Sequence, residues 1–213
     1  MATLGIVRRA IAGLTNGSEG NPTTDPSGAQ VVMDFYAKAV LNGYGYQVRA
    51  GTITTPLVGD VAITDTAAEY CVDTYTGGTI IPLSNQISVR AGTGTAHEFA
   101  IKSVATVSTA GTAFVPLPLK SDGPAAATTA RVQAAGAVTV TAELATTTLR
   151  HWEYGQQAVF TTGQVIIPLW EPLRPPRLVA PRCLYVQIAA ATTGPSYYAH
   201  LDYLEIPTAL LAT

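Results

Sequence analysis

The sequence predicts an all-β fold: an antiparallel, jelly-roll-like β-sandwich of about ten strands, with an extended N-terminal arm and one short helix. From Tyr44 onward, short runs rich in Val, Ile, Thr and Tyr recur at intervals of roughly 8–15 residues between Gly, Pro, Asn and Asp. Several runs alternate apolar and polar residues, as in Val138-Thr139-Val140-Thr141. Parallel strands would need crossover helices, and no helical pattern separates these runs.

The first element is a leader that has almost nothing to bury. Residues 15–30 are mostly Gly, Pro, Thr, Asn and Asp, a composition that does not form a core. Residues 1–30 are therefore predicted to be an extended arm, and residues 31–213 a single β-sandwich domain.

Residues 31–41 can form a short amphipathic helix. Asp34 and Lys38 make a favourable i, i+4 pair on its polar side, and Asn42-Gly43 supplies a helix stop. The same residues also fit the alternation of a strand, so the helix is favoured only slightly over a strand. The apolar face of the helix comprises Val31, Val32, Phe35, Tyr36, Ala39 and Val40.

Twelve segments between residues 46 and 206 are predicted to form strands. The predicted strand segments are 46–54, 60–65, 68–75, 78–83, 85–92, 97–108, 113–119, 137–144, 149–160, 164–170, 182–190 and 197–206. Three of them contain an apolar run followed by Pro-Leu, at Pro82, Pro116 and Pro168. Because proline cannot donate to a ladder, each of these prolines is expected to end a strand or to lie on a sheet edge.

The chain carries unusually few charges. Charged residues make up 12% of the sequence and the net charge is −2, while the hydrophobic share of 47% is ordinary. A mixed charged surface normally keeps monomers apart, so this deficit predicts a surface that lies against copies of itself or a partner. The excess of Arg over Lys, nine against three, also favours a contact surface, because Arg forms planar, stacked contacts at interfaces.

Composition also excludes several functional classes. A pI near 5.9 provides no broad basic field for nucleic acid. No apolar run approaches the roughly 20 residues of a membrane span. Arg8 and Arg9 interrupt the N-terminal apolar run, so no export signal is expected and the chain should originate in the cytoplasm. In that compartment Cys71 and Cys183 are expected to be two free buried thiols rather than a disulfide.

Catalytic chemistry finds little support. No nucleophile elbow, phosphate loop, dinucleotide fingerprint or Cys/His metal cluster occurs. His151 with Glu153, and His200 with Asp202, place a His and a carboxylate on one strand face. On neighbouring strands these four groups would suit a divalent metal, but polar surface residues are the favoured interpretation, and no cofactor, metal or catalytic residue is predicted.

Two segments are candidates for contact. Residues 170–182 hold several prolines, three Arg and a Trp, which fits either a docking arm or a rigid crossover connection. The aromatic cluster fits either a sugar-binding face or, more favourably, a core or interface. Its members are Trp152, Tyr154, Tyr197, Tyr198 and Tyr203.

The last two strands carry a resemblance. The apolar run Arg182-Cys-Leu-Tyr-Val, a small Ala/Thr/Gly turn ending at Gly194 and the closing strand 197–206 resemble structural proteins of tailed bacteriophage heads. The pattern is similar to that of jelly-roll capsid cement (decoration) proteins, a likeness covering the C-terminal strands only.

The resemblance implies a non-enzymatic virion protein that braces neighbouring capsid subunits. Its expected partners are a major capsid protein and copies of itself, as a homotrimer, without nucleic acid or membrane. A jelly-roll coat protein and a tail-associated receptor- or carbohydrate-binding module remain the alternatives. The expected interface residues are Arg8, Arg9, Trp170, Arg174, Arg177 and Arg182.

Overall fold

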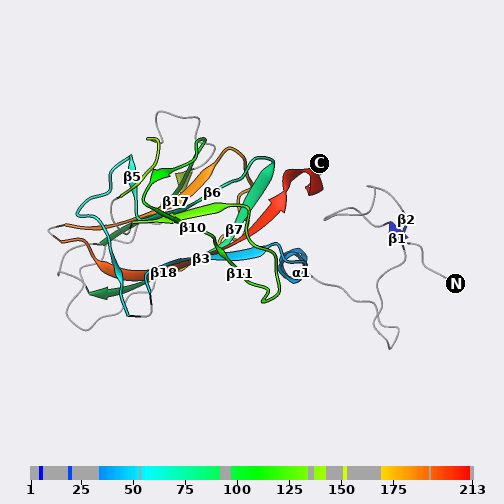
Figure 1. Cartoon of the computed structure of the whole chain (residues 1–213), viewed down its shortest axis with the longest axis horizontal. Coiled ribbons are helices and arrows are strands. Elements are labelled where there is room, and N and C mark those ends of the chain that lie inside the picture. Colours follow the sequence, from blue (N-terminus) through cyan, green and yellow to red (C-terminus); the bar gives the residue numbers. More distant parts are fainter. Residues whose placement is uncertain are drawn as a thin grey trace.

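Two large antiparallel sheets, which face each other in Figure 1, make up the body of the computed structural model. The structure describes residues 5–6, 19–20, 34–52, 54–91, 97–133, 137–142, 151–152, 169–191 and 193–211. The six-stranded sheet has the order β10 (Thr112–Phe114), β12 (Thr129–Val132), β6 (Tyr70–Asp73), β17 (Cys183–Ala190), β8 (His97–Val104) and β14 (His151–Trp152).

The second large sheet has seven strands. Its main order is β11 (Leu117–Pro118), β3 (Gly45–Ala50), β18 (Ser196–Pro207), β7 (Gly78–Ala91) and β15 (Leu169–Trp170). Two short strands complete it: β16 (Leu178–Val179) pairs with β7, and β4 (Leu57–Val58) pairs with β18.

Strand pairing is nested in the manner of a jelly roll. The pairs run from the outside of the chain inward: β3 pairs with β18, β6 with β17, β7 with β15 and β8 with β14. The pairs of β18 with β7 and of β17 with β8 then close the two sheets. The chain is a long hairpin rolled into two sheets, which confirms the predicted antiparallel jelly-roll sandwich.

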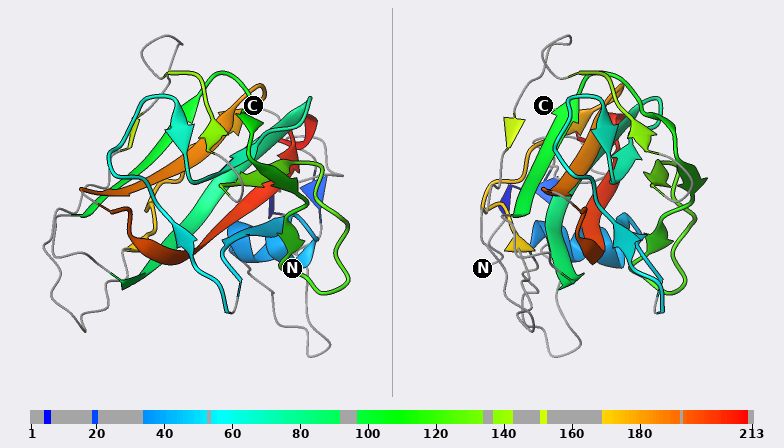
Figure 2. Two further views of the ribbon diagram at one scale, coloured as in Figure 1. Left: turned by 60° about the vertical axis from the view of Figure 1, so that its left-hand side comes forward. Right: turned by 90° about the vertical axis from the view of Figure 1, so that its left-hand side faces the viewer.

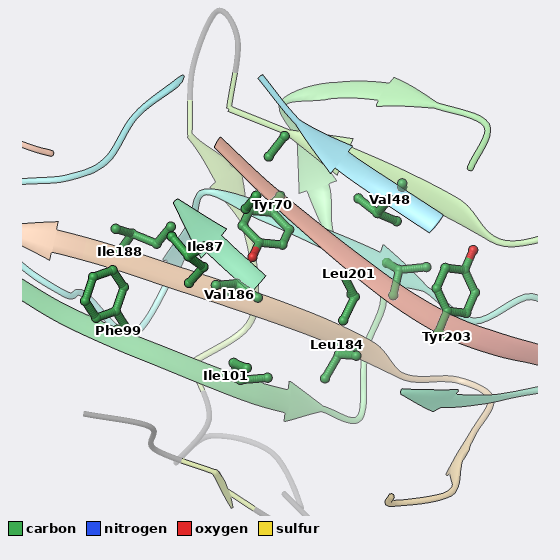
Figure 3. Close-up of a cluster of buried hydrophobic side chains, with 14 of the residues drawn as sticks. Val48, Tyr70, Ile87, Phe99, Ile101, Leu184, Val186, Ile188, Leu201 and Tyr203 are labelled. Carbon is green, nitrogen blue, oxygen red and sulfur yellow. The ribbon is translucent and has the colours of Figure 1, made fainter. Parts of the chain in front are cut away.

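The main core lies between these sheets. The strand β18 alternates buried and half-buried residues along most of its length, as a strand with one face in a core must. Figure 3 shows Leu184, Val186 and Ile188 of β17 together with Val48 of β3 and Leu201 of β18 in this core. All five side chains are fully buried, so this interface carries much of the apolar area removed from water.

The prediction for residues 78–92 was wrong in one respect. Instead of two strands separated after Pro82, one strand, β7, runs through the proline. Pro82 lies opposite Tyr203, beside a bulge in the pairing with β18. On the other side of β7, β16 pairs with residues 79–80 and β15 with residues 85–86, so Pro82 lies in the gap between them. A missing N–H is tolerated at such a place.

The other prolines agree with the prediction where the structure describes them. Pro116 separates β10 from β11, and both of these strands lie at sheet edges. Pro168 lies outside the described residues. The predicted strand 60–65 is not formed: Asp60 makes a single parallel bridge to Ala189 and the chain then turns. The amide of Asp60 donates a hydrogen bond to the carbonyl of Ile188, and the carbonyl of Asp60 accepts one from the amide of Ala190. These bonds direct the segment across the sheet.

A small second core covers the outer face of the six-stranded sheet. A three-stranded sheet lies over it, with the order β5 (Ala67–Ala68), β13 (Val138–Thr139) and β9 (Thr109–Ala110); β5 and its neighbours are in the upper part of both views of Figure 2. The small sheet packs against outward-facing residues of β6, β8 and β17. The buried residues of this cluster are Ala68, Cys71, Val104, Val138, Val140, Cys183 and Tyr185.

The helix predicted over residues 31–41 is confirmed over α1 (Phe35–Leu41), while residues 31–33 lie outside the described residues. Asp34 caps it by accepting hydrogen bonds from the amides of Tyr36 at 2.9 Å and Ala37 at 3.3 Å. Ala39 of the helix packs against Leu204 and Ile206, near the C-terminal 3₁₀ turn η2 (Thr208–Leu210). Within the described ranges, no helix is long and apolar enough to cross a membrane.

The predicted arm contains one described feature. The strands β1 (Gly5–Ile6) and β2 (Glu19–Gly20) pair antiparallel. The remainder of residues 1–30, including the expected interface residues Arg8 and Arg9, lies outside the described residues.

Candidate functional site

The outer face of the seven-stranded sheet has a shallow polar hollow. Gln47 and Arg49 of β3, Ser88 of β7, and Tyr198 and His200 of β18 line it, together with the turn after β3. The helix α1 packs on another part of this face, beside Leu204 of β18. The polar part, over which none of the described elements packs, is therefore the candidate binding site.

Strand register brings the hollow's polar residues together across the sheet. Arg49 lies opposite His200, and His200 lies opposite Gln86 on its other side. Residues directly opposite each other in an antiparallel pair project from the same face. A cation, an imidazole and an amide thus form one row, although they come from strands far apart in the sequence.

Hydrogen bonds in the neighbouring row orient Arg49. Asp202 accepts a bond from Gln47 Nε2 at 2.7 Å and another from Ser84 Oγ at 3.2 Å. The side-chain oxygen of Gln47 in turn accepts a bond from Nε of Arg49. The aspartate thereby fixes the amide, and the amide fixes the exposed guanidinium at the hollow.

Tyr198 supplies an aromatic surface at the same place. The guanidinium of Arg90 lies 5.7 Å from the centre of the Tyr198 ring and donates a 3.1 Å hydrogen bond to its hydroxyl. Gly51 has φ +87°, and a Cβ there would lie 2.8 Å from Cδ1 of Tyr198. Only glycine lets the turn approach the ring so closely. Two guanidinium groups, an imidazole and a phenol ring suit an anionic, hydroxylated ligand.

The structure does not assemble the four-residue metal site considered above. His151 is on β14, at the edge of the six-stranded sheet, whereas His200 is at the centre of the other sheet. Asp202 shares the outer face with His200, as the spacing predicts, and its oxygens accept hydrogen bonds from Gln47 and Ser84. Glu153 lies outside the described residues.

The aromatic cluster divides between core and surface. Tyr197 and Tyr203 are fully buried in the main core, where Tyr197 packs near Tyr70 at a ring separation of 6.4 Å. Tyr198 alone of the three C-terminal tyrosines lines the hollow. Trp152 is placed on β14, its side chain is not described, and Tyr154 lies outside the described residues.

Residues 170–182 leave one edge of the seven-stranded sheet and return to it. Trp170 pairs with Asn85 of β7 and packs half-buried against the main core. Arg174 and Arg177 are exposed on the connection that follows. Arg182 is 9% exposed, and its main chain is bonded to Thr74. Of the expected interface residues, only Arg174 and Arg177 are described as exposed.

Both edges of the seven-stranded sheet present aliphatic side chains to solvent. At the β11 edge, Val115, Leu117 and Leu119 are 59%, 47% and 39% exposed, while the intervening Pro116 is buried. At the opposite edge, Leu169 of β15 is 45% exposed and Leu173 of the following connection is 96% exposed. Edge strands are usually protected by charged residues or prolines, and at both of these edges prolines lie next to the exposed aliphatic side chains.

A buried thiol cluster lies outside the hollow. Cys71 and Cys183 are free and fully buried, which confirms the expectation of two free buried thiols. Burial, and next the contact with Cys71, raise the pKa of the Cys183 thiol well above its usual value. Sequence reasoning missed the third member of the cluster, Asp73, although its spacing from Cys71 places both on one strand face.

Comparison of the chain with protein-family models, with curated proteins and with solved structures finds no match. The fold class and the geometry of the surfaces are therefore the basis for the function proposed below.

Proposed function

We propose that the protein is a non-enzymatic virion structural protein, a capsid cement or decoration protein that braces neighbouring capsid subunits. The observation that carries this proposal is the exposure of aliphatic side chains at both edges of the seven-stranded sheet. A protein with contact surfaces on two opposite edges can join two neighbours at once, and repeated joining on a lattice gains affinity through multivalency.

The chemistry of the edges favours docking by side chains. Pro116 and Pro118 alternate with the exposed residues at the β11 edge, and Pro172, Pro175 and Pro176 surround Leu173 at the other. Prolines cannot extend a ladder, so these edges resist open-ended strand addition. The aliphatic side chains remain available for specific packing, and Arg174 and Arg177 are exposed beside them.

Replacing an edge leucine with an acid should weaken self-association without unfolding the domain. We expect Leu117→Asp and Leu173→Asp each to weaken self-association at least about tenfold, because a charge would be desolvated at the contact. Sedimentation equilibrium of the full chain measures this, with circular dichroism as the check on folding. Val61→Asp is the matched control, since Val61 is 59% exposed but lies on neither edge. Unchanged association of both edge variants would contradict the edge contacts.

Imaging of the particles that copurify with the chain tests the capsid assignment. A cement protein should occupy positions between capsid subunits, and the particle should still form when the chain is omitted. A jelly-roll coat protein would instead be required for any particle to form. Absence of the chain from purified heads would overturn both the cement-protein and the coat-protein assignments.

The polar hollow favours a second candidate, a carbohydrate-binding module for an acidic sugar. Arg49 is oriented for a carboxylate and Tyr198 offers a ring face at the same site. On an array of acidic glycans, Arg49→Ala should lower the affinity of the full chain about 10–100-fold, the cost of losing a charge-assisted hydrogen bond. Arg177→Ala, which removes an exposed Arg elsewhere, should leave binding unchanged. Failure of the wild-type chain to bind any acidic glycan would exclude this candidate.

A further inference from the structure

Three metal-ligating side chains converge beneath the small sheet that covers β6 and β17. The Sγ atoms of Cys71 and Cys183 and a carboxylate oxygen of Asp73 all lie within 4.8 Å of one another. Cys71 and Cys183 are fully buried and Asp73 is 5% exposed. Two thiolates on Zn²⁺ at about 2.3 Å would be about 3.8 Å apart, which is compatible with this grouping.

Strand register favours a shared ion over a disulfide. Cys183 lies directly opposite Asp73, whereas Cys71 lies opposite Tyr185. The two cysteines are therefore diagonal neighbours, whose Cβ atoms are normally farther apart than the roughly 3.5–4.5 Å that a disulfide requires. An ion between the sulfur atoms spans that diagonal, and Asp73 closes the triangle.

Ser108, which precedes β9, holds the carboxylate in place. Its amide donates to one oxygen of Asp73 at 2.8 Å and its hydroxyl donates to the other at 2.6 Å. The Ser108 hydroxyl oxygen also lies 3.1 Å from Sγ of Cys71. An outer group that orients a ligating carboxylate is a regular feature of metal sites. The same hydroxyl oxygen, in contact with both Asp73 and Cys71, can supply a fourth ligand.

The charge of the cluster balances with a divalent ion. Two thiolates and the Asp73 carboxylate carry three negative charges, and Nε of Arg131 lies 3.8 Å from that carboxylate. Zn²⁺ together with Arg131 supplies three positive charges, so the buried site would be neutral. Binding releases the two thiol protons to solvent and changes no oxidation state.

We propose that Cys71, Asp73 and Cys183 bind a structural Zn²⁺ ion, with the Ser108 hydroxyl as the fourth donor. Thiolate ligands combined with one carboxylate select Zn²⁺ over the hard cations Mg²⁺ and Ca²⁺. The ion joins β6, β17 and the chain before β9, and so ties the small covering sheet to the sandwich. Because the ligands are buried, the metal enters as the chain folds.

Cobalt substitution of the full chain tests the site. Protein is unfolded with chelator and reductant, freed of the chelator, and refolded under reductant with increasing Co²⁺, which should bind once per chain and give sulfur-to-cobalt charge-transfer absorption. Refolding with Zn²⁺ added should suppress that absorption. Cys183→Ala should weaken Co²⁺ binding at least about 100-fold, and Ser108→Ala about tenfold. Val138→Ala removes volume from the same buried cluster without removing a ligand, so it should keep full stoichiometry.

Several outcomes decide the proposal. The proposal is supported if the wild-type chain refolds only when Zn²⁺ is present and the Val138→Ala variant shows the same requirement for Zn²⁺. A wild-type chain that refolds under reductant with Co²⁺ present, as shown by circular dichroism, and binds no Co²⁺ overturns it. Binding of Co²⁺ that is equally strong in Cys183→Ala also overturns it, because the ion would then be held elsewhere.

Discussion

Replacing Glu69 with Gln should remove a large part of the pH dependence of stability between about pH 4.5 and 8. Glu69 lies between β5 and β6 and is 1% exposed. Burial, and next the nearby Asp60 carboxylate, raise its pKa from 4.5 to about 8, against the opposing effect of main-chain hydrogen bonds from Ile188 and Asp60. The variant should be more stable than the wild type at pH 8 and similar to it near pH 4.5.

The sign follows from proton linkage. Between pH 4.5 and 8 the folded protein holds a proton on Glu69 that the unfolded chain releases, so the free energy of unfolding falls as the pH rises. The slope contributed by this one group reaches at most about 1.4 kcal/mol per pH unit, and its total is on the order of 4 kcal/mol. Gln has the same shape and is neutral throughout, so it contributes no slope.

Urea unfolding at pH 5, 6, 7 and 8, followed by circular dichroism, measures the effect. The difference between wild type and Glu69→Gln isolates this group from the other carboxylates. Glu171→Gln is the matched control, because Glu171 is exposed. Parallel curves for the wild type and Glu69→Gln would show that Glu69 is already ionised in the folded protein.

Glu205→Ala should lower the free energy of unfolding by about 3 kcal/mol. Glu205 is 6% exposed and accepts hydrogen bonds from the amides of Ala127 and Thr128, each at 2.9 Å, and from the Thr128 hydroxyl at 2.6 Å. The Thr128 hydroxyl also lies 2.6 Å from that of Tyr203. Removing the carboxylate leaves these donors without their acceptor, and hydrogen bonds to a charged group are worth about 1.5–3 kcal/mol each.

Denaturant unfolding at one pH checks this prediction. Glu205→Gln keeps one acceptor oxygen and should be destabilised by less than Glu205→Ala. Glu171→Ala, at an exposed glutamate, should change stability by no more than about 0.5 kcal/mol. A loss below about 1 kcal/mol in Glu205→Ala would mean that the segment before β12 finds other acceptors.

The sequence predicts a strand of the sandwich best where one face of that strand is buried and the other is not. The alternation in residues 197–206 is read directly as the burial pattern of β18. The continuity of β7 through Pro82 was beyond such reasoning. It depends on the gap between β15 and β16, and both of these strands follow β7 in the chain by many residues.

The candidate sites depend on register, which a sequence does not contain. His200 and Asp202 were correctly placed on one strand face, but nothing local indicates that Arg49 lies opposite His200. The free buried thiols were expected from compartment and composition alone. Their meeting at Asp73 follows from the pairing of β6 with β17, a contact between distant segments.

The nested pairing also fixes when the two edges of the seven-stranded sheet take their final positions. The strand β18 is the last in the chain and the central strand of the seven-stranded sheet, with the β11 edge on one side and the β15 edge on the other. The two edges therefore have no fixed spacing until β18 has been synthesised and inserted. Such distant pairings form slowly, so a nascent chain cannot present both edges in register. Under the proposed bracing function, a chain would join two neighbours only once β18 is in place, so products that end before β18 would be excluded from a lattice.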